Sequence, residues 1–404
     1  MRGTDICAAE ALRPAHRTAE HEYCNDDAAR LRTPVSSDGR SALRTGIARL
    51  DGLVPTARVP KPDSGSLPRW GKHAPGTGGA DGGHFRTVGG RSGRGGFCFD
   101  APVTPSGYVW WYVDALSADA RYGLTIIGFI GSVFSPYYSL ARRRGRSDPL
   151  DHCALNVALY NDGRKLWAMT ERGRSRLHRT ASSLCIGPST MTWDDDVLTI
   201  RIEEKTAPIP TSLRGIVRVY PKVLCRRTFA LDKVGSHRWE AIAPCAHVEV
   251  RMSHPTVRWH GSGYIDSNSG NSPIEDAFHA WTWSRADLRR GTVVLYDVVR
   301  REGGDGRSAL LFNTAGGVEE FDPPSRVDLP ATSWRIARQT RTDNAHPARV
   351  IKTLENAPFY ARSLITTNLL GERPSAIHES LSLDRFRSRL VQAMLPFRMP
   401  RHRN

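Results

Sequence analysis

The sequence predicts an all-β protein, and three observations support this fold class. Short runs rich in β-branched and aromatic residues recur from Tyr108 onward, turn-forming Gly, Asp, Asn and Pro separate them, and no strong helical period lies between them. Runs of this kind, bounded by turn residues, are typical of β-strands. Because so many strands must bury their apolar faces against one another, we expect two packed sheets or barrels.

The expected strands form two series along the chain. The first series comprises residues 108–113, 124–134, 153–160, 165–170, 197–204 and 213–220, and the second comprises residues 237–244, 247–252, 278–284, 291–299, 308–314, 333–340 and 361–367. The longest apolar run, residues 124–134, is too short to cross a bilayer and is interpreted as a buried strand. The expected β domains are residues 98–232 and 233–370.

Both ends of the chain depart from this strand pattern. Residues 1–97 show no sustained periodicity, and ten glycines lie between positions 76 and 96, so we expect a disordered extension. Its arginine-glycine tract resembles RNA-binding segments, although a plain linker is the favoured interpretation. Residues 371–404 are expected to form a basic amphipathic tail. Its helical face comprises Leu383, Phe386, Leu390, Val391 and Met394.

Composition limits the classes of partner and site. The chain of 404 residues has a formal net charge of +16, which favours an anionic partner such as nucleic acid or an acidic membrane surface. Its seven cysteines contain no CxxC pair, and no signal-peptide core begins the chain, so we expect a cytoplasmic protein without disulfides or a zinc site. His247, His254 and His260 lack the carboxylate spacing of a metal centre, and no metal is expected.

Two residue pairs are the candidates for chemistry. His237 and Trp239, and likewise Tyr264 and Asp266, are separated by two positions. In a strand, this spacing places both side chains of a pair on one face, so the four groups are expected to point into one barrel interior. The alternative is that Asp266 caps a turn, that Trp239 and Tyr264 are ordinary core, and that backbone groups satisfy the hydrogen bonds of His237.

Several long stretches resemble one known family. GYVWWYVDALS, LTIIGFIGSVFSPYYSLARRRGR, DPLDHCALNVALY, HRWEAIAPCAHVEV and GYIDSNSGNSPIEDAFHAWTWSRADL are similar to the bacterial acyclic carotenoid 1,2-hydratases, also called hydroxyneurosporene synthases. The resemblance covers about residues 98–370 and leaves out the N-terminal extension. It implies two tandem lipocalin-like β-barrels. It also implies addition of water, without a cofactor, to the terminal C1–C2 double bond of neurosporene or lycopene.

The resemblance nominates His237, Trp239, Tyr264 and Asp266 as active-site residues. Asp266 is expected to be buried and protonated, because hydration of an alkene begins with proton delivery from an acid. Trp239 and Tyr264 are expected to stabilise the resulting cation with their ring faces. His237 either orients the water and takes its proton, or hydrogen-bonds Asp266. Asp276 is expected to be solvated, as is Glu275, which is a weak second candidate for proton handling.

Other expectations concern the substrate and the membrane. A polyene suits an aromatic channel, to which the motifs WWYVDA and SVFSPYY contribute Trp110, Trp111, Tyr137 and Tyr138, along with Tyr112 and Phe134. The basic stretch 141–146 is expected to be a loop. This loop and the C-terminal helix are candidates for peripheral docking onto the anionic lipid of the inner or photosynthetic membrane. The alternatives are a non-catalytic carrier of a hydrophobic ligand and, less favoured, a nucleic-acid-binding protein.

Overall fold

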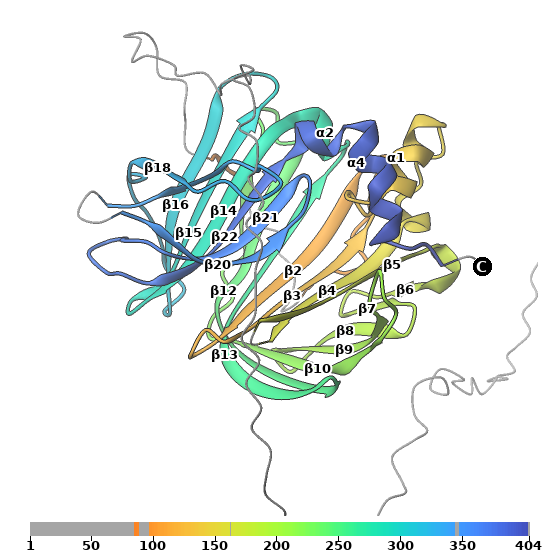
Figure 1. Cartoon of the computed structure of the whole chain (residues 1–404), viewed down its shortest axis with the longest axis horizontal. Helices are drawn as coiled ribbons and strands as arrows, with labels where there is room; N and C mark the ends of the chain where they lie inside the picture. The colour runs from red at the N-terminus through yellow and green to blue at the C-terminus, as the bar shows by residue number, and fades with distance from the viewer. Residues whose placement is uncertain (1–84, 89–96, 162, 344–346, 403–404) are drawn as a thin grey trace, which may run out of the picture. The chain divides into compact units, whose positions relative to one another are not determined.

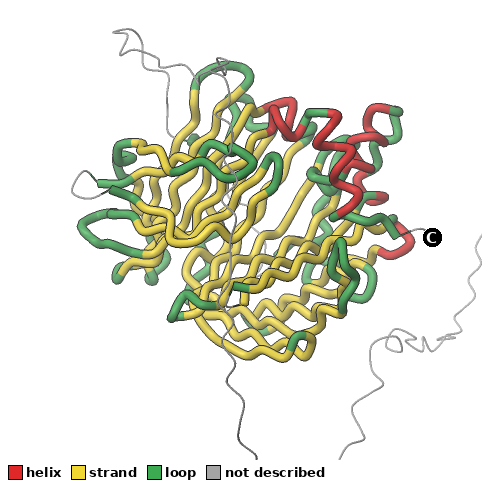
Figure 2. The backbone as a smooth tube through the Cα atoms, in the orientation of Figure 1, coloured by secondary structure: helices red, strands yellow, loops and turns green. Residues whose placement is uncertain are grey.

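The computed structural model describes residues 85–88, 97–161, 163–343 and 347–402, and these form a mostly β protein (Figures 1 and 2). The larger sheet is antiparallel, in the order β5-β4-β3-β2-β13-β12-β10-β9-β8-β7-β6, with β1 and β11 paired beside β12. Because β5 also contacts β9, the sheet curls into a nearly closed barrel. Its strands are β1 (Thr87–Val88), β2 (Tyr108–Ser117), β3 (Tyr122–Ile130), β4 (Cys153–Asn161), β5 (Arg164–Arg172), β6 (Leu177–Arg179), β7 (Ser183–Ile186), β8 (Ser189–Asp194), β9 (Val197–Lys205), β10 (Ser212–Pro221), β11 (Arg227–Ala230), β12 (His237–His254) and β13 (Thr256–Gly270).

A second antiparallel sheet follows in the order β17-β16-β15-β14-β22-β21-β20, and β18 pairs with β19 in a separate ribbon. These strands are β14 (Phe278–Leu288), β15 (Gly291–Arg300), β16 (Asp305–Asn313), β17 (Val318–Glu320), β18 (Arg326–Leu329), β19 (Arg338–Arg341), β20 (Arg349–Asn356), β21 (Tyr360–Thr366) and β22 (Ser375–Ser382). Hairpin connections join most neighbours, as expected for strands separated by short turns.

The two faces of the barrel wall belong to two different cores. Val113, Ile126 and Ile265 point inward with residues of nearly every barrel strand and fill the interior. Their sequence neighbours Tyr112 and Tyr264 point outward and pack against the second sheet. Alternation along each strand explains this division, because successive side chains point to opposite faces.

The boundary between the sheets differs from the expected domain boundary at residues 232 and 233. Strands β12 and β13 pair with β10 and β2, so they are central strands of the first sheet. The second sheet begins only at Phe278. The sequence indicated many of the strands but not which strands pair, since pairing depends on contacts distant in sequence.

The C-terminal region is not a separate tail. Strand β22 lies between β14 and β21 inside the second sheet. The expected single helix is divided into α3 (Leu383–Phe386), α4 (Arg389–Met394) and the 3-10 turn η3 (Leu395–Phe397). Only part of its apolar face is buried, because Leu390 is 73% and Met394 is 39% exposed. Among the described residues, no helix has the length and apolar character needed to cross a membrane.

The remaining helical segments lie in connections between strands. Helix α1 (Pro136–Arg143) begins at the cap residue Ser135, whose hydroxyl accepts from the backbone N–H groups of Tyr137 and Tyr138. The basic stretch 141–146 therefore starts as the last turn of a helix and is not wholly a loop. The other short segments are α2 (Ile274–Ala277), η1 (Pro149–Asp151) and η2 (Arg174–Arg176).

The expected disordered extension, residues 1–97, lies mostly outside the described residues. Its last part does not fit that expectation: β1 pairs with β11, and Phe85 and Phe97 are 4% and 6% exposed within the cores. Two phenylalanines in a Gly-rich segment give little periodicity, yet their burial offsets the cost of ordering a few residues.

Candidate active site

A pocket lies between the outer face of the barrel wall and the second sheet. It encloses about 860 Å³, including the part open to solvent, and aromatic side chains dominate its lining. The site is therefore outside the barrel interior in which the sequence analysis expected it. The expectation that the residue pairs share a face is correct, but that face is the outward one.

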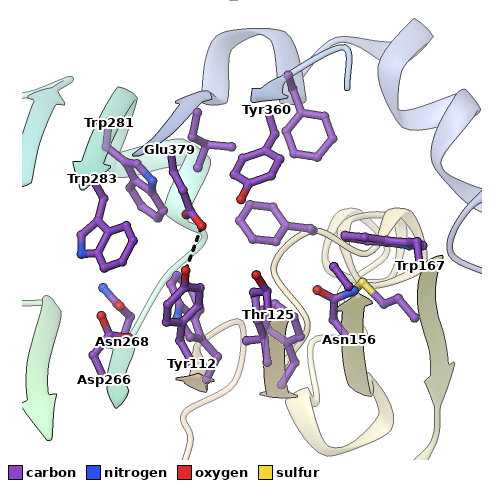
Figure 3. A pocket seen from close by; sticks show the side chains of 18 of the residues that line it. Tyr112, Thr125, Asn156, Trp167, Asp266, Asn268, Trp281, Trp283, Tyr360 and Glu379 are labelled. Atoms are coloured by element: carbon purple, nitrogen blue, oxygen red, sulfur yellow. Dashed lines mark hydrogen bonds between the residues drawn. The ribbon is translucent and has the colours of Figure 1, made fainter. Parts of the chain in front are cut away.

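Strand register builds the floor of the pocket. One row of paired residues crosses five neighbouring strands of the barrel wall and comprises Asp266, Tyr112, Ile127, Asn156 and Met169. Asp266 is the end of the row on β13. Figure 3 shows the same order, with Asp266 near one end of the pocket and Trp167 near the other.

The roof of the pocket comes from the second sheet. Trp283 pairs with Glu379 across β14 and β22, and Trp281 pairs with Leu381 in the adjacent row. In Figure 3, Trp281 and Trp283 lie on the Asp266 side of the pocket, and Tyr360 lies farther along. Each sheet thus contributes one wall, so both sheets are needed to form the site.

Asp266 lies in the middle of strand β13 and is 4% exposed, which excludes the turn-cap alternative. Its Oδ2 accepts two hydrogen bonds, from Nε1 of Trp239 at 2.8 Å and from the hydroxyl of Tyr264 at 2.8 Å. No hydrogen bond from the described residues engages Oδ1. This asymmetry suits a neutral carboxylic acid whose carbonyl oxygen is Oδ2 and whose hydroxyl faces the pocket.

Burial raises the pKa of Asp266 from 3.8 to about 7. Desolvation is the largest cause, because burial penalises the charged form of the carboxyl. The two donors to Oδ2 act in the opposite direction by stabilising the ionised form, and the negative charges of Glu379 and Asp114 raise the pKa further. At neutral pH, a large share of Asp266 is therefore protonated and able to donate.

Trp239 and Tyr264 act on Asp266 and do not line the pocket themselves. Both are fully buried beneath it. Burial and the adjacent Asp266 hold the pKa of Tyr264 well above 10, so its hydroxyl remains a donor. Other aromatic rings line the pocket, and those of Trp281 and Trp283 lie on its Asp266 side.

His237 is on the same strand as Trp239 but makes different contacts. Its Nδ1 lies 3.0 Å from the hydroxyl of Tyr108, and its Nε2 lies 3.2 Å from the hydroxyl of Ser272. A Cβ at Gly270 would lie 2.5 Å from Nδ1, so this close approach requires glycine there. Burial lowers the pKa of His237. Among the described residues, His237 neither hydrogen-bonds to Asp266 nor lines the pocket. Orienting the water would require a place in the lining, and setting the protonation of Asp266 would require a hydrogen bond to it.

Of the four expected substrate-binding residues, one lines the pocket and three do not. Trp110 lines the pocket and stacks on Tyr108 with ring centroids 5.0 Å apart. Trp111 points into the barrel interior, where its ring meets that of Phe99. Tyr138 donates to the backbone carbonyl of Gly107, and Tyr137 is half-buried on the same helix, away from the lining. Tyr112 and Phe134, from the same motifs, do line the pocket.

Glu275 is buried, contrary to the expectation of a solvated residue. Its carboxylate pairs with Arg142 at 2.6 Å, and both side chains are at most 10% exposed. Asp276 is exposed, as expected. Neither residue lines the pocket.

Sequence reasoning missed Asn268, Trp281, Trp283 and Glu379. Asn268 continues the spacing of Tyr264 and Asp266 by two further residues, and the run AWTW repeats an aromatic at the same spacing. Both signals were present in the sequence. Glu379 gave no comparable signal, because its segment was assigned to the tail.

A buried carboxyl group with a raised pKa beside an aromatic pocket is suited to acid catalysis on an apolar substrate. Within the described residues, no group of three or more His, Cys, Asp or Glu side chains is arranged to hold a metal ion. Residues 126–404 match the family model of the carotenoid hydratase CrtC. The chain belongs to this family, and the expected enzyme class, a hydro-lyase, is confirmed.

Two relatives support the same family assignment. The acyclic carotenoid 1,2-hydratase of Thiocapsa roseopersicina is 52% identical over 99% of both chains. That of Rubrivivax gelatinosus is 48% identical over 99% of this chain and 100% of its own length. The N-terminal extension, which the resemblance left out, is therefore aligned in both relatives. Among solved structures, AttH of Nitrosomonas europaea aligns with 13% identity over 68% of this chain and 92% of its own, with a TM-score of 0.47.

Proposed function

We propose that this protein adds water across the terminal C1–C2 double bond of an acyclic carotene such as neurosporene or lycopene, with Asp266 as the acid. The names of the relatives support the substrate. The single observation that carries the mechanism is the Asp266 carboxyl, whose Oδ2 is held by Trp239 and Tyr264 while Oδ1 is unengaged. An apolar pocket with few polar groups fits a polyene.

The first step transfers the Oδ1 proton of Asp266 to C2 and leaves a tertiary cation at C1. A carboxyl with a pKa of about 7 combines acidity with a large protonated fraction near neutral pH, as a general acid requires. The new negative charge on Asp266 is stabilised by Trp239 and Tyr264, whose hydrogen bonds strengthen as that charge develops.

The cation is stabilised by electron-rich surroundings. The rings of Trp281 and Trp283 line the pocket on the side of Asp266. A desolvated cation over such a ring gains on the order of 2 kcal/mol, or about thirtyfold in rate for each ring. Water then attacks C1 and gives the tertiary alcohol.

The test is incubation of the purified protein with lycopene in lipid vesicles and isotopically labelled water, followed by mass analysis of the pigment. Wild type is expected to give a labelled hydroxyl, and Asp266→Asn is expected to give none while still binding pigment. Asp232→Asn is the matched control, because its side chain only accepts from the backbone N–H groups of Ser236 and His237. Bound but unchanged pigment with wild type would favour the carrier alternative.

We also propose that the protein docks peripherally on anionic membrane lipid and is otherwise cytoplasmic. An apolar patch supports this, formed by Leu390, Met394 and Phe397, of which Leu390 and Phe397 are 73% and 72% exposed. Arg387 and Arg389 on the same segment are exposed, and the chain carries a net charge of +16. Met399, just beyond the patch, lines the pocket, so docking would bring the pocket toward the bilayer that holds the substrate.

We propose, in addition, that the two sheets form two tandem lipocalin-like barrels. The support for this is that both sheets are antiparallel, with mostly sequence-adjacent strands as neighbours. The second sheet has its own apolar cluster, which includes Val293, Leu311 and Ile365. That cluster lies on the face opposite the pocket.

A further inference from the structure

A second carboxyl lines the pocket from the opposite sheet. Glu379 is on β22 and has a side chain only 12% exposed. In Figure 3 it points down from the roof toward Tyr112 on the floor. Tyr112 is the cross-strand neighbour of Asp266, so one tyrosine lies beside Asp266 and contacts Glu379. Asp266 and Glu379 are the carboxyl groups of this lining.

The hydrogen bonds of Glu379 leave one oxygen open, as do those of Asp266. Oε1 accepts from the hydroxyl of Tyr112 at 3.0 Å and from the guanidinium of Arg362. No donor among the described residues engages Oε2. Arg362 also donates to Tyr112 at 2.7 Å and pairs with Asp114. Glu379 is therefore fixed on one side and has a free oxygen for a ligand in the pocket.

The two carboxyls differ in their electrostatic surroundings. Asp266 has indole and phenol donors and, within the described part of the chain, no ion-pair partner, whereas Glu379 forms an ion pair with Arg362. Desolvation acts to lower the pKa of Arg362, but interactions with Asp114, Tyr112 and Glu379 outweigh it and hold that pKa well above its usual range, so the positive charge is permanent. Where the surroundings of two carboxyl groups favour opposite protonation states, one group usually acts as the general acid and the other as the general base.

We propose that Glu379 is the general base of the hydration, which takes a proton from the water that attacks C1. This inference deepens the function proposed above and rests on it. Asp266 gives its proton to C2, and the π electrons form the new C–H bond. The water oxygen bonds to C1, and one water O–H bond breaks as its proton passes to Oε2 of Glu379. The proton then returns to Asp266 through solvent, so the net reaction is alkene plus water to alcohol.

Geometry favours Glu379 as the general base over His237, which the sequence analysis expected to take the proton of water. His237 bonds to Tyr108 and Ser272 and does not line the pocket. Glu379 lies on the wall opposite Asp266, so an alkene between the walls can receive the proton from one face and water from the other. The anion of Glu379 also adds to the electrostatic stabilisation of the cation at C1.

The test compares Glu379→Gln with wild type and with the control variant Glu204→Gln. Glu204 is also a buried carboxylate paired with an arginine, Arg172, but neither residue lines the pocket. The glutamine side chain in Glu379→Gln keeps the volume and an acceptor for Tyr112. Turnover with lycopene is expected to fall by about 10²–10⁴-fold in Glu379→Gln, the range for loss of a general base. Pigment binding is expected to be retained. Glu204→Gln is expected to keep the wild-type turnover, apart from any loss of folded protein, which thermal unfolding measures.

Two further readouts test the two effects assigned to the Glu379 carboxylate, proton transfer from water and the influence of its charge on Asp266. Formate added to Glu379→Ala is expected to restore part of the turnover, which a packing role would not allow. In Glu379→Gln, the alkaline limb of the activity profile is expected to move to lower pH, because the charge of Glu379 raises the pKa of Asp266. Besides Asp266, the ionisable groups that interact with Glu379 are Tyr112, Tyr160, Tyr296, Tyr360 and Arg362, and all are unchanged in the variant.

Failure of the base assignment can be distinguished from failure of the proposed function. If wild type hydrates lycopene and Asp266→Asn does not, but folded Glu379→Gln turns over within threefold of wild type, only the base assignment is overturned. The same holds if activity is lost without rescue by formate and without a shift of the alkaline limb. If Glu379→Gln does not fold, Glu379→Asp retains the ion pair and withdraws the carboxylate. A loss of about tenfold or more then supports the assignment, and full activity overturns it.

Discussion

At the scale of single residues, the property that makes Asp266 a useful acid also makes it costly to the folded state. Its carboxyl ionises near pH 3.8 when solvated but only near pH 7 in the fold. Between these values, the native state binds more protons than the unfolded state. The free energy of unfolding therefore decreases as pH rises across this window, by a total of about 4 kcal/mol.

Asp266→Asn is accordingly expected to abolish hydration yet to stabilise the protein at alkaline pH. The substitution removes the buried charge, so its stability relative to wild type should increase by up to about 4 kcal/mol between pH 4 and pH 8. Urea unfolding across this range measures the difference. Asp196→Asn, at an exposed turn, serves as the control. A difference that does not change with pH would contradict the buried-acid description.

The sequence predicted Asp266 better than it predicted Glu379, for a physical reason. Tyr264 and Asp266 lie two residues apart on one strand, and strand geometry alone places them together. Glu379 reaches the same pocket from a strand more than a hundred residues away. Only the packing of one sheet on the other brings it there, and single-sequence periodicity contains no information about that packing.

At the scale of elements, the C-terminal segment packs on the core in its first part and exposes an apolar patch in its second. Leu383 and Phe386 are fully buried, and Phe386 contacts Phe134 with ring centroids 5.8 Å apart, so the segment is part of the core. The end of the same segment exposes the apolar patch. Deletion of residues 380–404 would therefore unfold the second sheet and would not test membrane binding cleanly.

Substitution of the patch alone is the sharper test. Leu390→Ser, Met394→Ser and Phe397→Ser together are expected to weaken binding to vesicles with anionic lipid by at least tenfold. Partial insertion of three apolar side chains is worth more than about 1.4 kcal/mol. Flotation or tryptophan fluorescence can measure the affinity. Ile209→Ser with Val234→Ser is the matched control, since these side chains are 75% and 74% exposed outside the patch. Equal weakening in both variants would argue against a specific docking patch.

At the scale of the whole described unit, the positions of many strands were predictable from the sequence, but the pairing of the strands was not. Expected strands such as 153–160 and 291–299 match β4 and β15 closely. The two strands carrying the active-site pairs were assigned to the second domain, although they complete the first sheet. Their outward faces are apolar because the second sheet covers them, a cause that lies outside their own sequence.

The two sheets are expected to unfold together, because a buried ion cluster joins them. Asp114 on β2 is fully buried and accepts from Arg285 and Arg362 of the second sheet. Asp114→Asn removes the anion between two buried guanidinium groups and is expected to cost about 3–5 kcal/mol. Hydrogen exchange should show that amides of β4 and β21 lose the same protection. Asp287→Asn, which removes a half-exposed partner of Arg285 within the second sheet, should cost much less. If Asp114→Asn weakened β21 alone, the sheets would be independent domains, and the pocket would be an interface able to open without global unfolding.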